Sequence, residues 1–204
     1  MKKILIIGAT GTLGRAATQT MLNETDDQLT LFARSTNRIS ITDTSRETII
    51  SGNVMKDAEL EKAMAGQDAV FAALSGNLGA YAKKIIAAMD RNKVTRLVFI
   101  SSMGIYNEIP ASIGAGGNLE SNPVLQTYRD AADAIESSDL NYTVVRPGWF
   151  TGGPVNYEVT RKGEPFGGHD VSVSSIADLV AKLVNDDTLY SRDSVGINTP
   201  HASI

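Results

Sequence analysis

Residues 4–14 read Ile-Leu-Ile-Ile-Gly-Ala-Thr-Gly-Thr-Leu-Gly, an apolar run that stops at a turn rich in glycine. The apolar run is typical of a buried strand, and a helix-compatible segment follows the turn at once. The first N–H groups of a helix have no partner within the helix, and the helix dipole places partial positive charge at the same end. This stretch therefore predicts a strand that leads into a helix N-terminus and an anion site made of backbone groups.

The three glycines of this turn, Gly8, Gly11 and Gly14, have separable roles. In dinucleotide-binding turns the first allows a tight turn, the second lets the backbone approach pyrophosphate, and the third lets the helix pack closely on the strand. Because the motif follows a strand and opens a helix, we predict that it binds a dinucleotide. The alternative is a tight strand–helix turn without a ligand. The predicted contacts comprise the whole turn: Gly8, Ala9, Thr10, Gly11, Thr12, Leu13 and Gly14.

The composition argues against several kinds of site and partner. The chain has 204 residues, no cysteine and a formal net charge of -4. The lack of cysteine excludes disulfides and thiol nucleophiles, and it suits a reducing cytoplasm, where we expect the protein. The net charge does not favour nucleic acid or anionic membranes, and no apolar stretch approaches the length of a membrane span. His169 and His201 stand alone in expected surface loops, so we predict no metal site.

Strand-like and helix-like segments alternate along the chain, which predicts an α/β protein. Strands that are apolar on both sides and separated by helices form a parallel sheet covered on both faces. We therefore predict a doubly wound, three-layer αβα arrangement, the NAD(P)-binding Rossmann fold, with residues 1–204 as a single domain. The expected strands are Ile4–Ile7, Leu29–Ala33, Thr48–Ile50, Ala69–Ala73, Leu97–Ile100 and Tyr142–Val145, and the expected helices are Leu13–Leu22, Ala58–Met64, Ala80–Arg91 and Val124–Glu136.

Residues 147–175 depart from this alternation. Glycines and prolines recur there at close spacing, so we expect an irregular excursion on the substrate side of the sheet. In the helix that follows, Ser175 and Asp178 fit a capping box, which predicts the helix N-terminus. Ser194–Asn198 are expected to add a final strand.

The ends of the expected strands predict where a ligand binds, because ligands of open α/β sheets lie outside the carboxyl ends of the strands. Small or polar residues follow every expected strand, which predicts one continuous cleft. They are the glycine turn after the first strand, Arg34 and Ser35 after the second, Asn53 and Val54 after the third, Leu74 and Ser75 after the fourth, Ser101 and Ser102 after the fifth, and Pro147 and Gly148 after the sixth.

The residue after the second strand indicates which dinucleotide binds. An NAD site usually has a carboxylate here for the ribose hydroxyls, whereas this chain has Arg34, with Ser35 and Arg38 close by. A guanidinium can hold a 2′-phosphate through two charge-assisted hydrogen bonds. We therefore predict NADP(H) in preference to NAD(H), with Arg34 as the main 2′-phosphate contact. The alternative is that Arg34 is a solvated surface charge.

These motifs together resemble a known superfamily. The glycines follow the pattern G-x-x-G-x-x-G, and with L-F-A-R-S, G-N-V, F-I-S-S-M-G-I-Y and Y-T-V-V-R-P-G the chain resembles the atypical short-chain dehydrogenases/reductases. Within them it is most similar to the compact NmrA-like, NAD(P)H-binding proteins, which include flavin and biliverdin reductase-like members. The resemblance covers nearly the whole chain.

The resemblance implies further cofactor contacts at matching positions. Asn53 and Val54 would flank adenine, and Pro147 and Gly148 would lie beside the nicotinamide amide. The dinucleotide would also be lined by residues at or directly after the ends of the fourth and fifth strands: Ala73, Leu74, Ser75 and Ser101.

The resemblance also implies a catalytic group, a serine with a Y-x-x-x-K pair in which lysine lowers the pKa of the acid/base tyrosine. Ser102 matches the serine and Tyr128 the tyrosine, but Ala132 stands at the lysine position. Arg129 lies elsewhere on the expected helix and does not replace the lysine. Two interpretations of Tyr128 stay open, a weak proton donor or a packing residue. Ser102 likewise either holds the substrate or caps the strand end.

Three functions are compatible with these residues. The first is an NADPH-dependent oxidoreductase that reduces a flat acceptor, a flavin or a quinone, by direct hydride transfer with little acid/base help. The second, favoured by Ala132, is a regulatory protein that senses NADP(H) without turnover. The third, a sugar-nucleotide epimerase or dehydratase, fits least, because such enzymes generally need the Tyr–Lys pair. We expect a small-molecule substrate and a monomer or homodimer.

Aromatic residues of the excursion allow two interpretations. They either form an apolar lid over the nicotinamide or pack as ordinary core residues. They are Trp149, Phe150, Tyr157 and Phe166.

Overall fold

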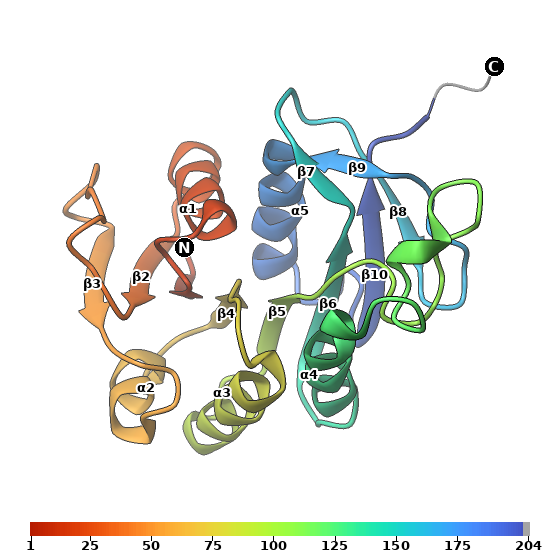
Figure 1. The fold of residues 1–204 in the computed structure, drawn as a ribbon. Coiled ribbons are helices and arrows are strands. Elements are labelled where there is room, and N and C mark those ends of the chain that lie inside the picture. Colours follow the sequence, from red (N-terminus) through yellow and green to blue (C-terminus); the bar gives the residue numbers. More distant parts are fainter. Residues whose placement is uncertain (202–204) are drawn as a thin grey trace.

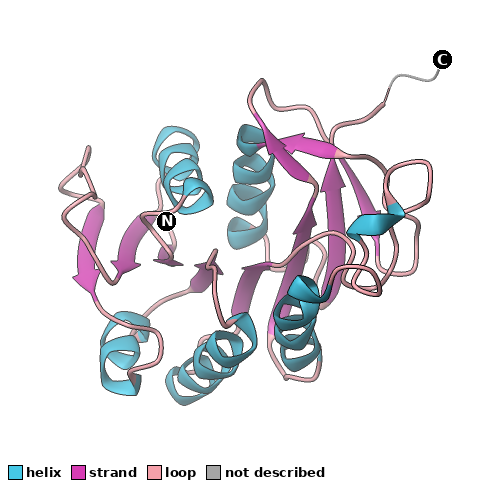
Figure 2. Ribbon diagram, in the orientation of Figure 1, coloured by secondary structure: helices cyan, strands magenta, loops and turns pink. Residues whose placement is uncertain are grey.

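The protein is built on a central sheet with helices on both faces, as the computed structural model, which describes residues 1–201, shows (Figures 1 and 2). The strands follow the order β3-β2-β1-β4-β5-β6-β10-β8. All neighbours are parallel except β10 and β8. This confirms the doubly wound arrangement. The strands are β1 (Lys3–Ile7), β2 (Gln28–Ala33), β3 (Glu47–Ser51), β4 (Ala69–Ala72), β5 (Arg96–Ile100), β6 (Asn141–Pro147), β8 (Glu158–Arg161) and β10 (Asp193–Asn198).

The central strands are buried on both faces, so their side chains alternate between two cores. Leu5 and Ile7 of β1 pack under α2, α3 and α4, whereas Ile4 and Ile6 pack under α1 and α5. In Figure 1 these helices form two layers, one above the sheet and one below it. Their bounds are α1 (Thr12–Glu24), α2 (Asp57–Met64), α3 (Leu78–Asn92), α4 (Gln126–Glu136) and α5 (Val173–Asn185).

The helix expected at Val124–Glu136 begins two residues later than predicted. Pro123–Leu125 form a separate 3₁₀ turn, and α4 starts at Gln126. The proline stands in the first turn of the 3₁₀ segment, where its missing N–H costs nothing.

The excursion is more ordered than its composition predicts. It contains β7 (Trp149–Thr151) and β9 (Asp170–Ser172), which pair as a small parallel sheet, and β8, which pairs antiparallel with β10 at the edge of the main sheet (Figure 1). Edge strands are exposed on one side and lack the continuous apolar run of a central strand. The final strand is confirmed, because β10 covers the expected residues.

The predicted capping box of the last helix is wrong. The helix begins at Val173, and the Ser172 side chain caps it by accepting a hydrogen bond of 3.1 Å from the Ser175 backbone N–H. Asp178 instead accepts a hydrogen bond of 2.8 Å from the Tyr157 hydroxyl. Ser172 lies three residues before Ser175, and this earlier pair makes the cap.

None of the helices within residues 1–201 is long and apolar enough to cross a membrane.

Candidate functional site

A cavity of about 260 Å³ opens at the carboxyl ends of β3, β2, β1 and β4, and we name it the glycine-turn cavity. The four strands are neighbours in the sheet, so the fold gathers residues that are far apart in the sequence. Among residues 1–201, no carboxylate lines the cavity. Ten of the predicted cofactor residues line it: Gly8, Thr10, Gly11, Arg34, Ser35, Asn53, Val54, Ala73, Leu74 and Ser75.

The three glycines of the turn differ in whether the fold could accept a side chain in their place. Gly8 has a φ of 89°, and a Cβ there would lie 2.0 Å from the Ala73 carbonyl oxygen. A Cβ on Gly14 would lie 2.1 Å from the Gly8 carbonyl oxygen. Gly11 has an ordinary φ of -75°, and its Cβ would meet nothing closer than 3.5 Å. The fold therefore requires glycine at positions 8 and 14, whereas glycine at position 11 only leaves room in the cavity.

The N-terminus of α1 has backbone N–H groups that are available to bind a ligand. Its N-cap is Gly11, no side chain caps it, and no acidic residue lies in the first turn. The N–H groups of that turn thus lack both a cap and a compensating charge, which are the conditions under which a helix end attracts an anion. The turn fits the pyrophosphate of a dinucleotide.

Arg34 and Arg38 line two different cavities. Arg34 is exposed, lines the glycine-turn cavity and forms no ion pair with any residue between 1 and 201. Arg38 lines a separate cavity of about 300 Å³ beside α1, together with Arg15 and Glu47. The sequence analysis did not single out Arg15 as a residue of this cavity, although Arg15 directly follows Gly14 of the glycine turn.

Some predicted contacts of the turn are part of the core rather than the cavity lining. Ala9, Leu13 and Gly14 are buried, and the first two pack in the core on the α1 side of the sheet. Thr12 is exposed and does not line the cavity. Sequence reasoning also missed Tyr81, which lines the cavity from the first turn of α3.

A second cavity of about 420 Å³ opens at the ends of β5 and β6, and we name it the Trp149 cavity. It brings together the two catalytic candidates, Ser102 and Tyr128, which lie on different elements. The remaining predicted cofactor residues are here too: Ser101, Pro147 and Gly148.

The Trp149 cavity contains no replacement for the family's lysine. The Ser102 hydroxyl donates to the Met103 carbonyl at 2.9 Å, and the Ser101 hydroxyl donates to the Tyr128 carbonyl at 3.3 Å. Ala132 is fully buried, and Arg129 is bonded to Asp133 and to the Ile105 carbonyl rather than to Tyr128. No charged side chain of the described part of the chain, residues 1–201, lines the cavity. Proton transfer by Tyr128 would therefore lack the neighbouring cation on which the family depends.

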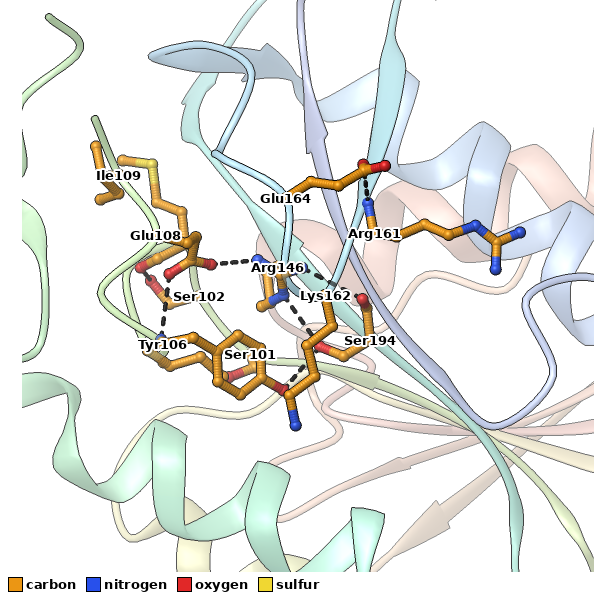
Figure 3. Close-up of polar contacts among 12 residues, drawn as sticks. Ser101, Ser102, Tyr106, Glu108, Ile109, Arg146, Arg161, Lys162, Glu164 and Ser194 are labelled. Atoms are coloured by element: carbon orange, nitrogen blue, oxygen red, sulfur yellow. Dashed lines mark hydrogen bonds and ion pairs between the residues drawn. The ribbon is translucent and has the colours of Figure 1, made fainter.

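A polar network surrounds Arg146, the residue before Pro147 of this cavity (Figure 3). Arg146 precedes Pro147 and is 1% exposed; it pairs with Glu108 and donates to the Ser194 hydroxyl at 3.0 Å. The Tyr106 hydroxyl lies 2.7 Å from a Glu136 carboxylate oxygen, and burial raises the pKa of this tyrosine well above its usual range. The network fixes the loop after β5 to β6 and β10.

The aromatic residues of the excursion lie in two places: two line the Trp149 cavity, and two pack against buried residues. Trp149 and Phe150 line the Trp149 cavity. Phe166 is buried with Met103 and Ile109, which fits the packing interpretation. The packing interpretation also fits Tyr157, which packs beside α5, where burial raises its pKa to about 12.

Two solved structures are similar to this chain over nearly its whole length. A Rossmann-fold NAD(P)-binding family protein from Shigella flexneri is 36% identical, with a TM-score of 0.84 over 100% of this chain and 98% of its own. A short-chain dehydrogenase/reductase from Veillonella parvula, in complex with NADP, is 29% identical, with a TM-score of 0.89 over 98% of this chain and 95% of its own.

Sequence comparison also finds the oxidoreductase stcQ of Emericella nidulans, 26% identical over an alignment of 181 residues, and the match covers 72% of this chain. This chain spans 65% of the length of that relative. The model of the NAD(P)H-binding family matches residues 8–187. The chain therefore belongs to the NAD(P)H-binding family, and it is similar to a short-chain dehydrogenase/reductase of solved structure.

Proposed function

We propose that this protein is an NADPH-dependent oxidoreductase that reduces a flat redox acceptor. One observation carries the proposal: the glycine-turn cavity and the Trp149 cavity open on neighbouring strand ends, β4 and β5, along one edge of the sheet. One cavity offers anion-binding backbone groups, and the other offers an apolar space. This is the division that a dinucleotide and its acceptor require.

The residues of the glycine-turn cavity would hold NADPH. The N–H groups of the first turn of α1 would bind the pyrophosphate, and Arg34 would bind the 2′-phosphate. The absence of a lining carboxylate supports NADPH over NADH, because a carboxylate would repel the 2′-phosphate. The NADP complex of the Veillonella protein supports the same choice. When bound, the cofactor supplies a hydride.

The residues of the Trp149 cavity would orient the acceptor and exclude water from it. Trp149 and Phe150 would stack against a flat ring. The Ser102 and Tyr128 hydroxyls would contact its polar edge. Orientation of this kind accelerates transfer without a catalytic acid.

Replacing Tyr128 with phenylalanine is therefore expected to lower kcat by less than about tenfold, because loss of a true general acid costs about 100- to 10,000-fold. The measurement is steady-state NADPH oxidation with the best acceptor found, with Ser102→Ala as the matched variant. A loss above about 100-fold with unchanged NADPH affinity would show that Tyr128 is the acid after all.

The missing lysine favours one other function, a sensor of NADP(H) without turnover. Ala132 leaves the cavity uncharged, and a sensor needs no proton relay. The experiment that separates the two is NADPH oxidation with a panel of flavins and quinones. Oxidation with any of them supports the enzyme, whereas tight NADPH binding with no oxidation supports the sensor.

A further inference from the structure

The Trp149 cavity is apolar and carries no charge, although it is large enough for a ring system. Its apolar lining consists of Ile100, Met103, Leu125, Pro147, Trp149 and Phe150. We propose that its ligand is an uncharged quinone rather than a phosphorylated flavin or an acceptor with carboxylates. The proposal rests on the proposed function, because it names the acceptor of that same site.

The charge of the lining argues against anionic acceptors. A phosphate or carboxylate taken into an apolar cavity loses its hydration, and the cost is recovered only when a cation pairs with it. In the part of the chain that the structure describes, no lysine, arginine or histidine lines the cavity. The nearest arginine on α4, Arg129, is already bonded to Asp133 at 2.8 Å. An uncharged ring avoids this cost.

The hydrogen-bonding groups of the cavity match a quinone. The Ser101 and Ser102 hydroxyls already donate to backbone carbonyls. Within residues 1–201 the Tyr128 hydroxyl and the Asn122 side-chain amide make no hydrogen bond, so they remain as side-chain donors. A quinone presents two carbonyl acceptors, one for each donor. A flavin also presents ring N–H and N groups, which would stay unpaired in an apolar cavity.

The mouth of the cavity offers a surface for a flat ring. Trp149 is 65% exposed and Phe150 is 49% exposed, and both lie on β7. Exposed aromatic side chains of this size are typical of binding sites, because they bury a large area at low entropic cost. The reaction balances with a quinone: NADPH, quinone and one proton give NADP⁺ and hydroquinone. The quinone gains two electrons with the hydride, and its second proton comes from water.

The test compares two pairs of acceptors in which one member carries an added anionic group. Riboflavin and FMN differ by one phosphate, and menadione differs from its ring-sulfonated analogue by one sulfonate. Binding is followed by quenching of Trp149, the single tryptophan of the chain, so the readout does not require turnover. We expect menadione to bind at least about tenfold more tightly than its sulfonate and than riboflavin, and riboflavin more tightly than FMN. FMN binding as tightly as menadione would overturn the proposal.

Adding one positive charge to the lining provides a second test. Asn122→Arg is suited to it, because the Asn122 side chain caps nothing in the 3₁₀ turn that follows. We expect this variant to bind the sulfonate at least about tenfold more tightly than the wild type does, with weaker binding of menadione. The control is Val124→Arg, since Val124 is 73% exposed and does not line the cavity.

The outcomes distinguish this proposal from the proposed function. Quenching by menadione without NADPH oxidation would support the quinone site and contradict the proposed oxidoreductase function. NADPH oxidation with FMN but not with menadione would leave the oxidoreductase standing and reject the quinone.

Discussion

Replacing Arg146 with methionine is expected to lower the free energy of unfolding by about 3–5 kcal/mol. Arg146 is 1% exposed and pairs with Glu108, which is 8% exposed, so the substitution leaves a buried carboxylate without its cation. The two hydrogen bonds from Arg146 to Ser194 are lost as well. Urea denaturation of the wild type and the variant measures the difference.

The double variant Arg146→Met with Glu108→Gln is the matched control for this prediction. It removes both charges, and removal of a whole buried pair costs much less than removal of one partner. We expect the double variant to be more stable than Arg146→Met alone. A double variant as unstable as the sum of the two single changes would show that the pair itself contributes nothing.

Replacing Gly11 with alanine is expected to weaken NADPH binding by about 100-fold, or about 2.7 kcal/mol, without unfolding the protein. Position 11 has an ordinary φ of -75°, and the added Cβ would meet no protein atom closer than 3.5 Å. The methyl group would instead occupy space beside the free N–H groups of α1. Calorimetric titration with NADPH, together with thermal unfolding, separates the two effects.

Two other glycines provide controls for this substitution. Gly152→Ala meets no atom within 4 Å and lies outside the cavity, so it should change neither property. Gly14→Ala would bring a Cβ to 2.1 Å from the Gly8 carbonyl oxygen, so it should lower both stability and binding. Wild-type NADPH affinity in Gly11→Ala would contradict a pyrophosphate at this turn.

The sheet and the glycine-turn cavity could be predicted from the sequence because their signals are local. A run such as Ile4–Ile7 is apolar at every position only when both faces of the strand are covered. Right-handed crossovers then leave few strand orders, and the strand ends collect the residues that follow them. Gly8 and Arg34 thus line the same cavity because their strands are neighbours in the sheet.

The features that sequence reasoning missed depend on contacts distant in the chain. Arg146 and Glu108 pair across 38 positions, and no local pattern marks them as partners. The sequence left a lid and core packing both open for Phe166, because an aromatic residue in an irregular segment carries no sign of its partners, Met103 and Ile109. Arg38 was grouped with Arg34 by proximity, but the loop after β2 turns it toward a different cavity.

Selection of NADPH through Arg34 is the central property of the proposed cofactor site. The measurement that tests this is the pair of dissociation constants for NADPH and NADH, in the wild type, in Arg34→Ala and in Lys83→Ala, which removes an exposed charge away from the glycine-turn cavity. We predict at least about tenfold tighter binding of NADPH in the wild type and in Lys83→Ala, and loss of most of this preference in Arg34→Ala. Equal affinity of the wild type for the two cofactors would contradict the account.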